Sequence, residues 1–107
     1  MEIHRELGKG HSEVVYKDAL CIELIRAGIP YAREKKYEII YKGVVLAHPY
    51  YADFVVGEVI IVEAKAVEAL TESHVRQVLN NLAASKVRLG LLINFGTDSL
   101  DWKRVVL

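Results

Sequence analysis

The chain has 107 residues, of which 52% are hydrophobic and 26% charged, a composition typical of a folded domain and not of a disordered segment. This length suits one domain, and we expect residues 1–107 to form a single one. The 14 basic and 14 acidic residues give a formal net charge of zero, which excludes a global attraction to nucleic acid or to an anionic membrane.

The sequence contains one cysteine, Cys21, so no disulfide can form within the chain. No apolar run approaches the roughly 20 residues that a membrane-spanning helix needs. The start of the sequence is polar and lacks the pattern of a signal peptide. We therefore expect a cytoplasmic protein that is not associated with a membrane.

Residues 12–27 are predicted to form the first long helix. Ser12 is suited to cap its start, and Gly28 followed by Pro30 ends it. Residues 2–8 have the composition of an earlier helical turn. The apolar side chains of the long helix recur at helical spacing: Tyr16, Leu20, Leu24 and Ala27.

Residues 33–41 are rich in β-forming side chains and predict a first strand. Lys42-Gly43 is suited to a hairpin turn, after which residues 44–56 continue as a long strand that bends at Pro49. Basic residues gather around the first strand, where they either hold a phosphate backbone or keep a sheet edge from aggregating: Arg33, Lys35, Lys36 and Lys42.

A turn at Gly57-Glu58 precedes a third strand over residues 59–66. Thr71 is suited to cap a second helix, and residues 87–95 form a final buried strand, with residues 102–107 as a candidate for one more. The order helix, three strands, helix, strand indicates an α/β fold with a mixed sheet flanked by two helices. The second helix has one apolar face: Val75, Val78, Leu79, Leu82 and Ala83.

Two charged residues end an otherwise apolar strand. Alternate residues of a strand share a face, so Glu63 and Lys65 point the same way as Ile61. A surface ion pair at the end of the strand would explain Glu63 and Lys65 by themselves.

Asp53 changes that interpretation, because it is an acid between apolar residues of the preceding strand and needs a partner or a metal. A hairpin brings Asp53 toward Glu63. Two neighbouring carboxylates repel, so the pKa of one should rise unless a cation lies between them. Mg²⁺ or Mn²⁺ suits such oxygen ligands, and Lys65 could then hold or help to deprotonate an attacking water. The pattern is that of metal-assisted phosphodiester hydrolysis.

A shared metal site sets a condition on the hairpin. With a two-residue loop, Val56 would pair with Val59, and Asp53 and Glu63 would point to opposite faces. With a three-residue loop, Val56 pairs with Ile60 and Asp53 faces Glu63. The metal-site hypothesis therefore predicts an odd loop or a bulge, although the strands are apolar on both faces and their periodicity cannot choose between the two registers.

Several short segments match a known pattern. "GHSEVVY" at residues 10–16 resembles the signature of the GxxExxY protein family, a branch of the PD-(D/E)XK nuclease superfamily. The similarity continues through "YKG" from Tyr41, "ADFVV" from Ala52, "VEAKA" from Val62 and "GLLINFG" from Gly90. The resemblance covers nearly the whole chain and implies a restriction-endonuclease-type core in the order αβββαβ.

The resemblance also implies roles for individual residues. Asp53, Glu63 and Lys65 correspond to the catalytic D…(D/E)xK triad, and the two carboxylates with the backbone carbonyl of Ala64 would be the metal ligands. Glu13 would be an accessory acid from the first helix, although the helix dipole, which favours an acid in a first turn, is the better explanation of Glu13 taken by itself.

Gln77 and Asn81 are the candidate substrate-binding residues on the second helix. Gln77 matches the family pattern, but the family usually has Tyr where this chain has Asn81. The change removes an aromatic surface on which a base could stack. Both residues lie opposite the apolar face, so they are either solvated surface or the lining of a cleft.

Three functions fit these observations. The first is a Mg²⁺- or Mn²⁺-dependent nuclease acting on DNA in preference to RNA. The second is a catalytically silent nuclease-fold module that binds nucleic acid or a protein partner, with a homodimer as a candidate assembly. The third is a scaffold whose acids are incidental. The four residues Glu13, Asp53, Glu63 and Lys65 favour the first function, and zero net charge with Asn81 favours the second.

Overall fold

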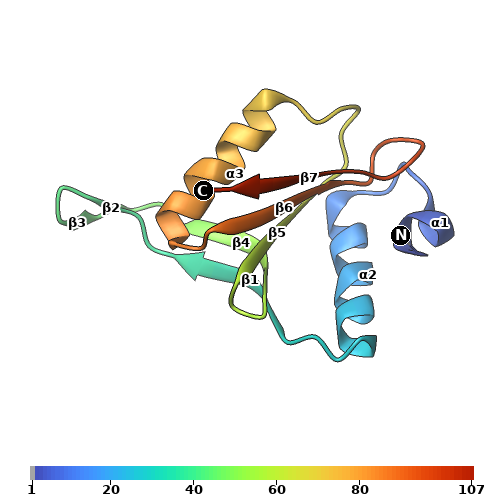
Figure 1. The fold of residues 1–107 in the computed structure, drawn as a ribbon, viewed down its shortest axis with the longest axis horizontal. Coiled ribbons are helices and arrows are strands. Elements are labelled where there is room, and N and C mark those ends of the chain that lie inside the picture. Colours follow the sequence, from blue (N-terminus) through green and yellow to red (C-terminus); the bar gives the residue numbers. More distant parts are fainter. Residues whose placement is uncertain (1) are drawn as a thin grey trace.

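A five-stranded mixed sheet forms the centre of the computed structural model, which describes residues 2–107 (Figure 1). Its strand order is β1-β4-β5-β6-β7, and a separate two-stranded sheet is formed by β2 and β3. The helices are α1 (Glu2–Leu7), α2 (Glu13–Arg26) and α3 (Glu72–Ser85). The strands are β1 (Tyr31–Tyr37), β2 (Ile40–Tyr41), β3 (Val44–Val45), β4 (Tyr50–Val56), β5 (Ile60–Lys65), β6 (Leu89–Asn94) and β7 (Asp101–Val106).

The sheet is mixed because β5 and β6 pair in parallel and the other neighbouring strands pair antiparallel. A parallel pair needs a long crossover, and α3 supplies it. The predicted α/β fold with a mixed sheet is confirmed, with α1 and β7 added to the expected order and the arm β2–β3 set apart from the sheet.

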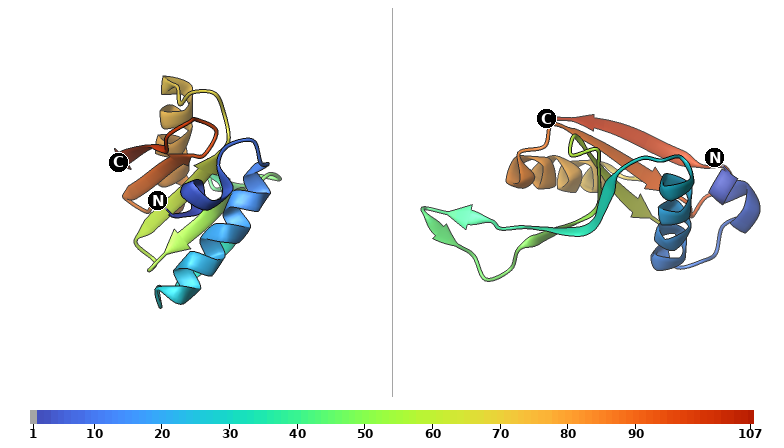
Figure 2. Two further views of the ribbon diagram at one scale, coloured as in Figure 1. Left: turned by 90° about the vertical axis from the view of Figure 1, so that its right-hand side faces the viewer. Right: turned by 90° about the horizontal axis from the view of Figure 1, so that it is seen from below.

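Helices cover both faces of the sheet (Figure 2). On one face, α2 packs through Tyr16, Leu20 and Leu24 against Phe54 and Val62. On the opposite face, Val78 and Leu82 of α3 pack into a second cluster with strand residues: Ala52, Val55, Ile61, Leu92 and Val105. The structure therefore has two apolar layers, one on each side of β5.

The predicted helices are found with nearly the expected bounds. Ser12 occupies the N-cap of α2, but its side chain makes no capping hydrogen bond, so the expected cap is wrong in its chemistry. Thr71 does cap α3: its hydroxyl accepts the His74 N–H, and the His74 side chain accepts the Thr71 N–H. None of the helices in residues 2–107 is long and apolar enough to cross a bilayer.

The long second strand is wrong as predicted, because residues 46–49 interrupt it. The Lys42-Gly43 turn is confirmed, with φ values of 50° and 78°, but β2 and β3 on either side are short. Pro49 lacks an N–H and cannot continue a ladder, so the interruption before β4 follows from its chemistry. Residues 38–49, here called the arm, project away from the sheet (Figures 1 and 2).

The β4–β5 hairpin has the register that a shared metal site requires. Val56 pairs with Ile60 and Val55 with Ile61 across the three-residue loop Gly57–Val59. Gly57 and Glu58 have φ values of 59° and 63°, and the Val59 N–H donates to the Val56 carbonyl at 3.2 Å. The predicted odd loop is confirmed, and continuing the register sets Asp53 opposite Glu63.

The β1–β4 ladder is distorted where Glu34 faces Asp53. The flanking pairs Arg33–Phe54 and Lys35–Ala52 keep one register, but Glu34 has a φ of 52°. Phe54 packs on the α2 side of the sheet, whereas Ala52 packs on the α3 side. Residues two apart normally share a face. The strand therefore changes face at Asp53, and this change turns the start of β4 toward α3.

Candidate functional site

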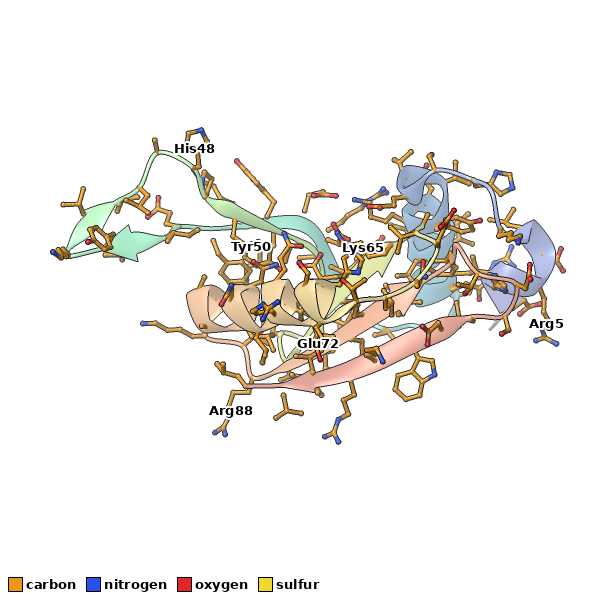
Figure 3. All side chains as sticks on the ribbon, turned by 90° about the horizontal axis from the view of Figure 1, so that it is seen from above. Arg5, His48, Tyr50, Lys65, Glu72 and Arg88 are labelled. Carbon is orange, nitrogen blue, oxygen red and sulfur yellow. The ribbon has the colours of Figure 1, made fainter. Side chains whose placement is uncertain are left out.

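One pocket of about 220 Å³ lies between the start of β4, the end of β5 and α3. It contains five of the residues singled out from the sequence. Its lining is Tyr50, Tyr51, Asp53, Glu63, Lys65, Gln77, Val78 and Asn81. Figure 3 labels Tyr50 and Lys65, which lie beside α3 with His48 of the arm beyond them.

Chemistry, and not size, distinguishes this pocket. A hollow of about 540 Å³ between α3 and β7 is lined mainly by apolar atoms and has one carboxylate, Glu72. Another of about 280 Å³ beside the β4–β5 turn also has a single carboxylate, Glu58. Asp53 and Glu63 share the 220 Å³ pocket with the ammonium group of Lys65.

Asp53 is held at the point where β4 and β5 separate. The β4–β5 ladder ends at Phe54–Val62. Beyond it, Oδ2 of Asp53 accepts the Ala64 N–H at 2.9 Å, in place of the backbone partner that the ladder would supply. The Asp53 carboxylate thus takes the place of a ladder hydrogen bond where the two strands separate, and the Ala64 N–H holds the carboxylate in position.

Lys17 of α2 holds the other oxygen of the same carboxylate. Its Nζ lies 3.2 Å from Oδ1 of Asp53 and 3.0 Å from Oε1 of Glu34, and its side chain is 15% exposed. Burial lowers the pKa of Lys17, but the two carboxylates raise it by more, so it stays charged at neutral pH. Sequence reasoning missed Lys17, although it follows Glu13 by one helical turn on the same face of α2.

Glu63 is the buried carboxylate of the site, with 8% exposure. Burial, and then the charge of Asp53, raises its pKa from 4.5 to about 8, although a hydrogen bond from the Tyr50 hydroxyl lowers it. The expected rise in one carboxylate pKa is therefore present, and Glu63 keeps its proton at neutral pH. Burial, followed by the hydrogen bond to Glu63, raises the pKa of Tyr50 as well.

Tyr50 reaches Glu63 only because β4 changes face at Asp53. Regular alternation would put Tyr50 on the side of Phe54, which packs against α2. Instead it packs with the α3-side cluster and donates its hydroxyl to Glu63. The sequence has no signal for this, since a break in alternation leaves no trace in a run of apolar residues.

Glu13 does not join this pocket. It is the first residue of α2 and half-buried, but it is not among the residues that line the pocket. Within residues 2–107, no three His, Cys, Asp or Glu side chains come close enough to hold one ion together. From α2, the side chain that contacts Asp53 is that of Lys17.

The polar face of α3 lines the cleft, as a functional interpretation of that face requires. Gln77 and Asn81 lie one helical turn apart and both line the pocket. Their sequence neighbours Val78 and Leu82 are buried in the core. None of the ion pairs among residues 2–107 involves Lys65. Its ammonium therefore has no carboxylate partner that would hold it back from a substrate.

Asn94 and Gly96 hold the chain just after Lys65. The Asn94 amide is fully buried, accepts the Val67 N–H at 3.0 Å and donates to the Val67 carbonyl at 2.9 Å. A Cβ on Gly96 would lie 2.4 Å from the Val67 carbonyl oxygen, closer than any side chain can fit. Sequence analysis noted both residues only as part of "GLLINFG", and the structure shows that they fix the end of β5.

The donor set fits a divalent cation with oxygen ligands. Asp53 and Glu63 supply two carboxylates, and their mutual repulsion is what a cation would relieve. The Lys65 carbonyl accepts the Phe95 N–H, so the backbone groups of Lys65 face β6. Backbone direction alternates along a strand, so the N–H and C=O of Ala64 face β4. The Ala64 N–H donates to Asp53, and the Ala64 carbonyl therefore lies on the same side of β5 as Asp53. Mg²⁺ commonly binds one or two carboxylates and keeps several waters.

Comparisons with known proteins identify the superfamily and support the fold. A family model described as the PD-(D/E)XK nuclease superfamily matches residues 1–105. The solved structure described as "Crystal structure of SSO0001" has a similar fold, with a TM-score of 0.69 and 19% identity. The alignment covers 86% of this chain and 48% of that chain, so this chain spans about half the length of that protein. No curated protein matches. Because the family model matches nearly the whole sequence, the chain belongs to the PD-(D/E)XK nuclease superfamily.

Proposed function

We propose that this chain is a metal-dependent nuclease that hydrolyses phosphodiester bonds, with DNA as its preferred substrate over RNA. One observation carries the proposal: Asp53, Glu63, Lys65, Gln77 and Asn81 line a single pocket. These residues come from two strands and a helix, and they include both carboxylates and the amine of the D…(D/E)xK pattern.

The proposed metal ligands are Asp53, Glu63 and the backbone carbonyl of Ala64, with Mg²⁺ or Mn²⁺ as the ion. When bound, such an ion supplies Lewis acidity toward the phosphate and a lower pKa for a coordinated water. Glu63 must give up its proton to become a full ligand, so binding should release a proton at neutral pH.

Lys65 is the proposed group that orients the attacking water and stabilises charge on the phosphate. It shares a strand face with Glu63 and lines the same pocket. The amides of Gln77 and Asn81 can donate to phosphate or sugar oxygens. Tyr51, which is half exposed at the pocket, can supply the stacking surface that Asn81 does not.

Lys17 is a positioning residue in this proposal. Its ion pair with Asp53 fixes that carboxylate from the α2 side, and its ion pair with Glu34 ties the ammonium to β1. The Ala64 N–H fixes the same carboxylate from β5. Glu13, one turn earlier on α2, remains our candidate for an accessory acid when substrate occupies the cleft.

The proposal extends to the setting of the protein. The match of Gly10, Glu13 and Tyr16 supports the GxxExxY branch of the superfamily. We further propose a single domain over residues 1–107, a cytoplasmic location, and nucleic acid and a second copy of the chain as partners.

A second candidate is a catalytically silent module that binds nucleic acid or protein. Asn81 at the position of the usual Tyr favours it, as does a formal net charge of zero. In that case the carboxylate site would remain as part of the fold without supporting hydrolysis.

Calorimetric titration with Mn²⁺, followed by a cleavage assay on labelled single- and double-stranded DNA and RNA, separates the two candidates. We expect binding of one ion that Asp53→Ala abolishes, and cleavage that depends on it. Metal binding without cleavage of any substrate would favour the silent module. No metal binding by the folded wild-type protein would overturn the nuclease proposal.

A further inference from the structure

The arm, residues 38–49, leaves most of its side chains exposed within the described residues 2–107. It carries five exposed large apolar side chains and projects from the sheet along the longest dimension of the molecule (Figure 1). A two-stranded hairpin is marginal in water when nothing packs on it. The side chains, with their exposed fractions, are Ile40 (65%), Tyr41 (59%), Val44 (63%), Val45 (52%) and Leu46 (41%).

The outer edge of β2 is free for pairing. The two-stranded sheet contains only β2 and β3, with Ile40 opposite Val45 and Tyr41 opposite Val44. The Leu46 N–H donates to the Ile39 carbonyl at 2.8 Å, so the backbone groups of Ile39 face β3. Backbone direction alternates along a strand, and the N–H and C=O of Ile40 therefore point outward.

The sequence around Ile40 is complementary to itself when reversed. Residues 38–42 read Glu-Ile-Ile-Tyr-Lys, with an acid and a base at equal distances from the centre. Two such segments paired antiparallel about Ile40 bring Glu38 of each copy close to Lys42 of the other. Ile39 then lies opposite Tyr41, and Ile40 opposite itself. Opposite charges and apolar pairs across strands both stabilise a sheet.

We propose that two copies of this chain associate through their arms, with β2 of one pairing antiparallel with β2 of the other about a twofold axis at Ile40. The contact is isologous and closed, as in most homodimers. It converts two exposed two-stranded hairpins into one four-stranded sheet and removes the free edge of each β2. The inference gives the proposed homodimer its interface, and it does not depend on nuclease activity.

Other occupants of the arm fit less well. Nucleic acid would favour a basic arm, but residues 38–49 contain one Lys and one Glu, apart from His48. The outer edge of β3 is a poorer site for self-pairing, because residues 43–47 have no charge to fix a register. A different protein could add a strand to the same edge, and the experiment below distinguishes that case.

Sedimentation of the purified full chain over a range of concentrations tests the association. We expect a reversible monomer–dimer equilibrium that Ile40→Lys weakens at least tenfold, because it places two like charges at the axis. Val59→Lys is the matched control, since Val59 is as exposed as Ile40 but lies in the β4–β5 loop. A monomer at all accessible concentrations, or a dimer that Ile40→Lys leaves unchanged, would overturn the proposal.

Charge reversal tests the register. Glu38→Lys and Lys42→Glu should each weaken the dimer, because each creates two like-charge pairs, and the double variant should restore it. Restoration is the expected result only if Glu38 of one copy meets Lys42 of the other. Equal weakening in the double variant would contradict the antiparallel register about Ile40.

Crosslinking tests the axis directly, in a Cys21→Ala background. Hydrogen-bonded antiparallel partners have Cα atoms about 5.5 Å apart, within the range that a disulfide spans. Ile40→Cys should therefore form a disulfide-linked dimer on mild oxidation, whereas Val45→Cys, exposed on the same arm but opposite β2, should not. Equal crosslinking by both variants would indicate collision and not a fixed axis.

Discussion

Asp53 combines two roles at the scale of single residues. One oxygen replaces a backbone acceptor for Ala64, and the other meets the Lys17 ammonium. Removing this carboxylate therefore leaves the buried Ala64 N–H without its acceptor and the mostly buried Lys17 ammonium with Glu34 as its remaining partner, which is unfavourable whether or not a metal binds. A loss of activity in Asp53→Ala can therefore be assigned to lost metal binding only when a thermal melt shows that the variant is folded. Calorimetric titration of that folded variant with Mn²⁺ then measures the metal binding itself.

Lys65→Ala should lower the cleavage rate at least about 100-fold, the usual scale for losing a group that acts on the nucleophile. The variant should keep its stability, because Lys65 forms no ion pair among residues 2–107. Lys103→Ala on β7 is the control for loss of a positive charge that does not line the pocket. Full activity of Lys65→Ala in a single-turnover assay would remove this residue from the mechanism.

Glu63→Gln should stabilise the metal-free protein at high pH. The folded-state pKa of Glu63 is about 8 against an ordinary 4.5, so its favourable contribution is complete below about pH 4.5 and is lost as the pH rises through 8. Glutamine resembles the protonated acid and keeps that contribution. We expect the variant to gain on the order of 2 kcal/mol at pH 8.5 and almost nothing at pH 4.5.

Thermal melts in a chelator at the two pH values measure this difference. Glu68→Gln, in the exposed segment before α3, is the control for the general effect of removing a carboxylate. A Glu63→Gln variant that is less stable than wild type at pH 8.5 would mean that the Glu63 carboxylate is ionised and well paired in the folded state.

At the scale of elements, the β4–β5 hairpin fixes the relation between the two carboxylates. Its loop has two successive residues with positive φ, and only one of them is glycine. Glu58, with a φ of 63°, is strained relative to Gly at the same position. The strain follows from the three-residue connection, and no hydrogen bond or ion pair of the Glu58 side chain is found among residues 2–107.

Glu58→Gly should therefore raise the free energy of unfolding by about 0.5–1 kcal/mol without a change in activity. Glu68→Gly is the matched control, because Glu68 is exposed but does not have a positive φ, and it should lower the stability or leave it unchanged. Chemical denaturation measures both differences. A destabilised Glu58→Gly variant would show that its carboxylate contributes to the turn.

Much of the fold and part of the site could be predicted from these elements. Strand alternation placed Glu63 and Lys65 on one face, and the requirement for a shared site selected the register found for Val55 and Val56. Tyr50 could not be predicted, because its position depends on the change of face at Asp53, whereas Lys17 was missed although it lies one helical turn after Glu13 on the same face of α2. The change of face coincides with the positive φ of Glu34 on the neighbouring strand, a backbone conformation that hydrophobic periodicity does not report.

At the scale of the whole molecule, charge limits how nucleic acid can bind. The net charge is zero, so attraction must come from a few basic groups near the pocket. The candidates on β1, next to β4, are Arg33, Lys35 and Lys36, and Arg33 is already paired with Asp18 at 2.8 Å. Few phosphates are then neutralised on binding.

The affinity for DNA should accordingly depend only modestly on salt. With about three to four phosphate contacts, the logarithm of the binding constant should fall with log salt with a slope of roughly −3. Replacing Lys35 and Lys36 together by Ala should make the slope shallower by about 2. Fluorescence anisotropy with a labelled duplex at several salt concentrations measures both slopes, and a wild-type slope near −8 would require a much larger basic surface.

The β4–β5 hairpin also has a consequence for how the chain folds. Asp53 and Glu63 belong to strands joined by a three-residue loop, and such a hairpin closes in about 1–10 μs. The parallel pairing of β5 with β6 must wait for the α3 crossover, which is a slower, non-local step. The two carboxylates therefore meet while they are still hydrated, and the burial that keeps a proton on Glu63 comes later. A divalent ion that binds the early hairpin would stabilise the folding transition state almost as much as the native state. Its effect should then appear mainly as faster refolding, with little change in the unfolding rate.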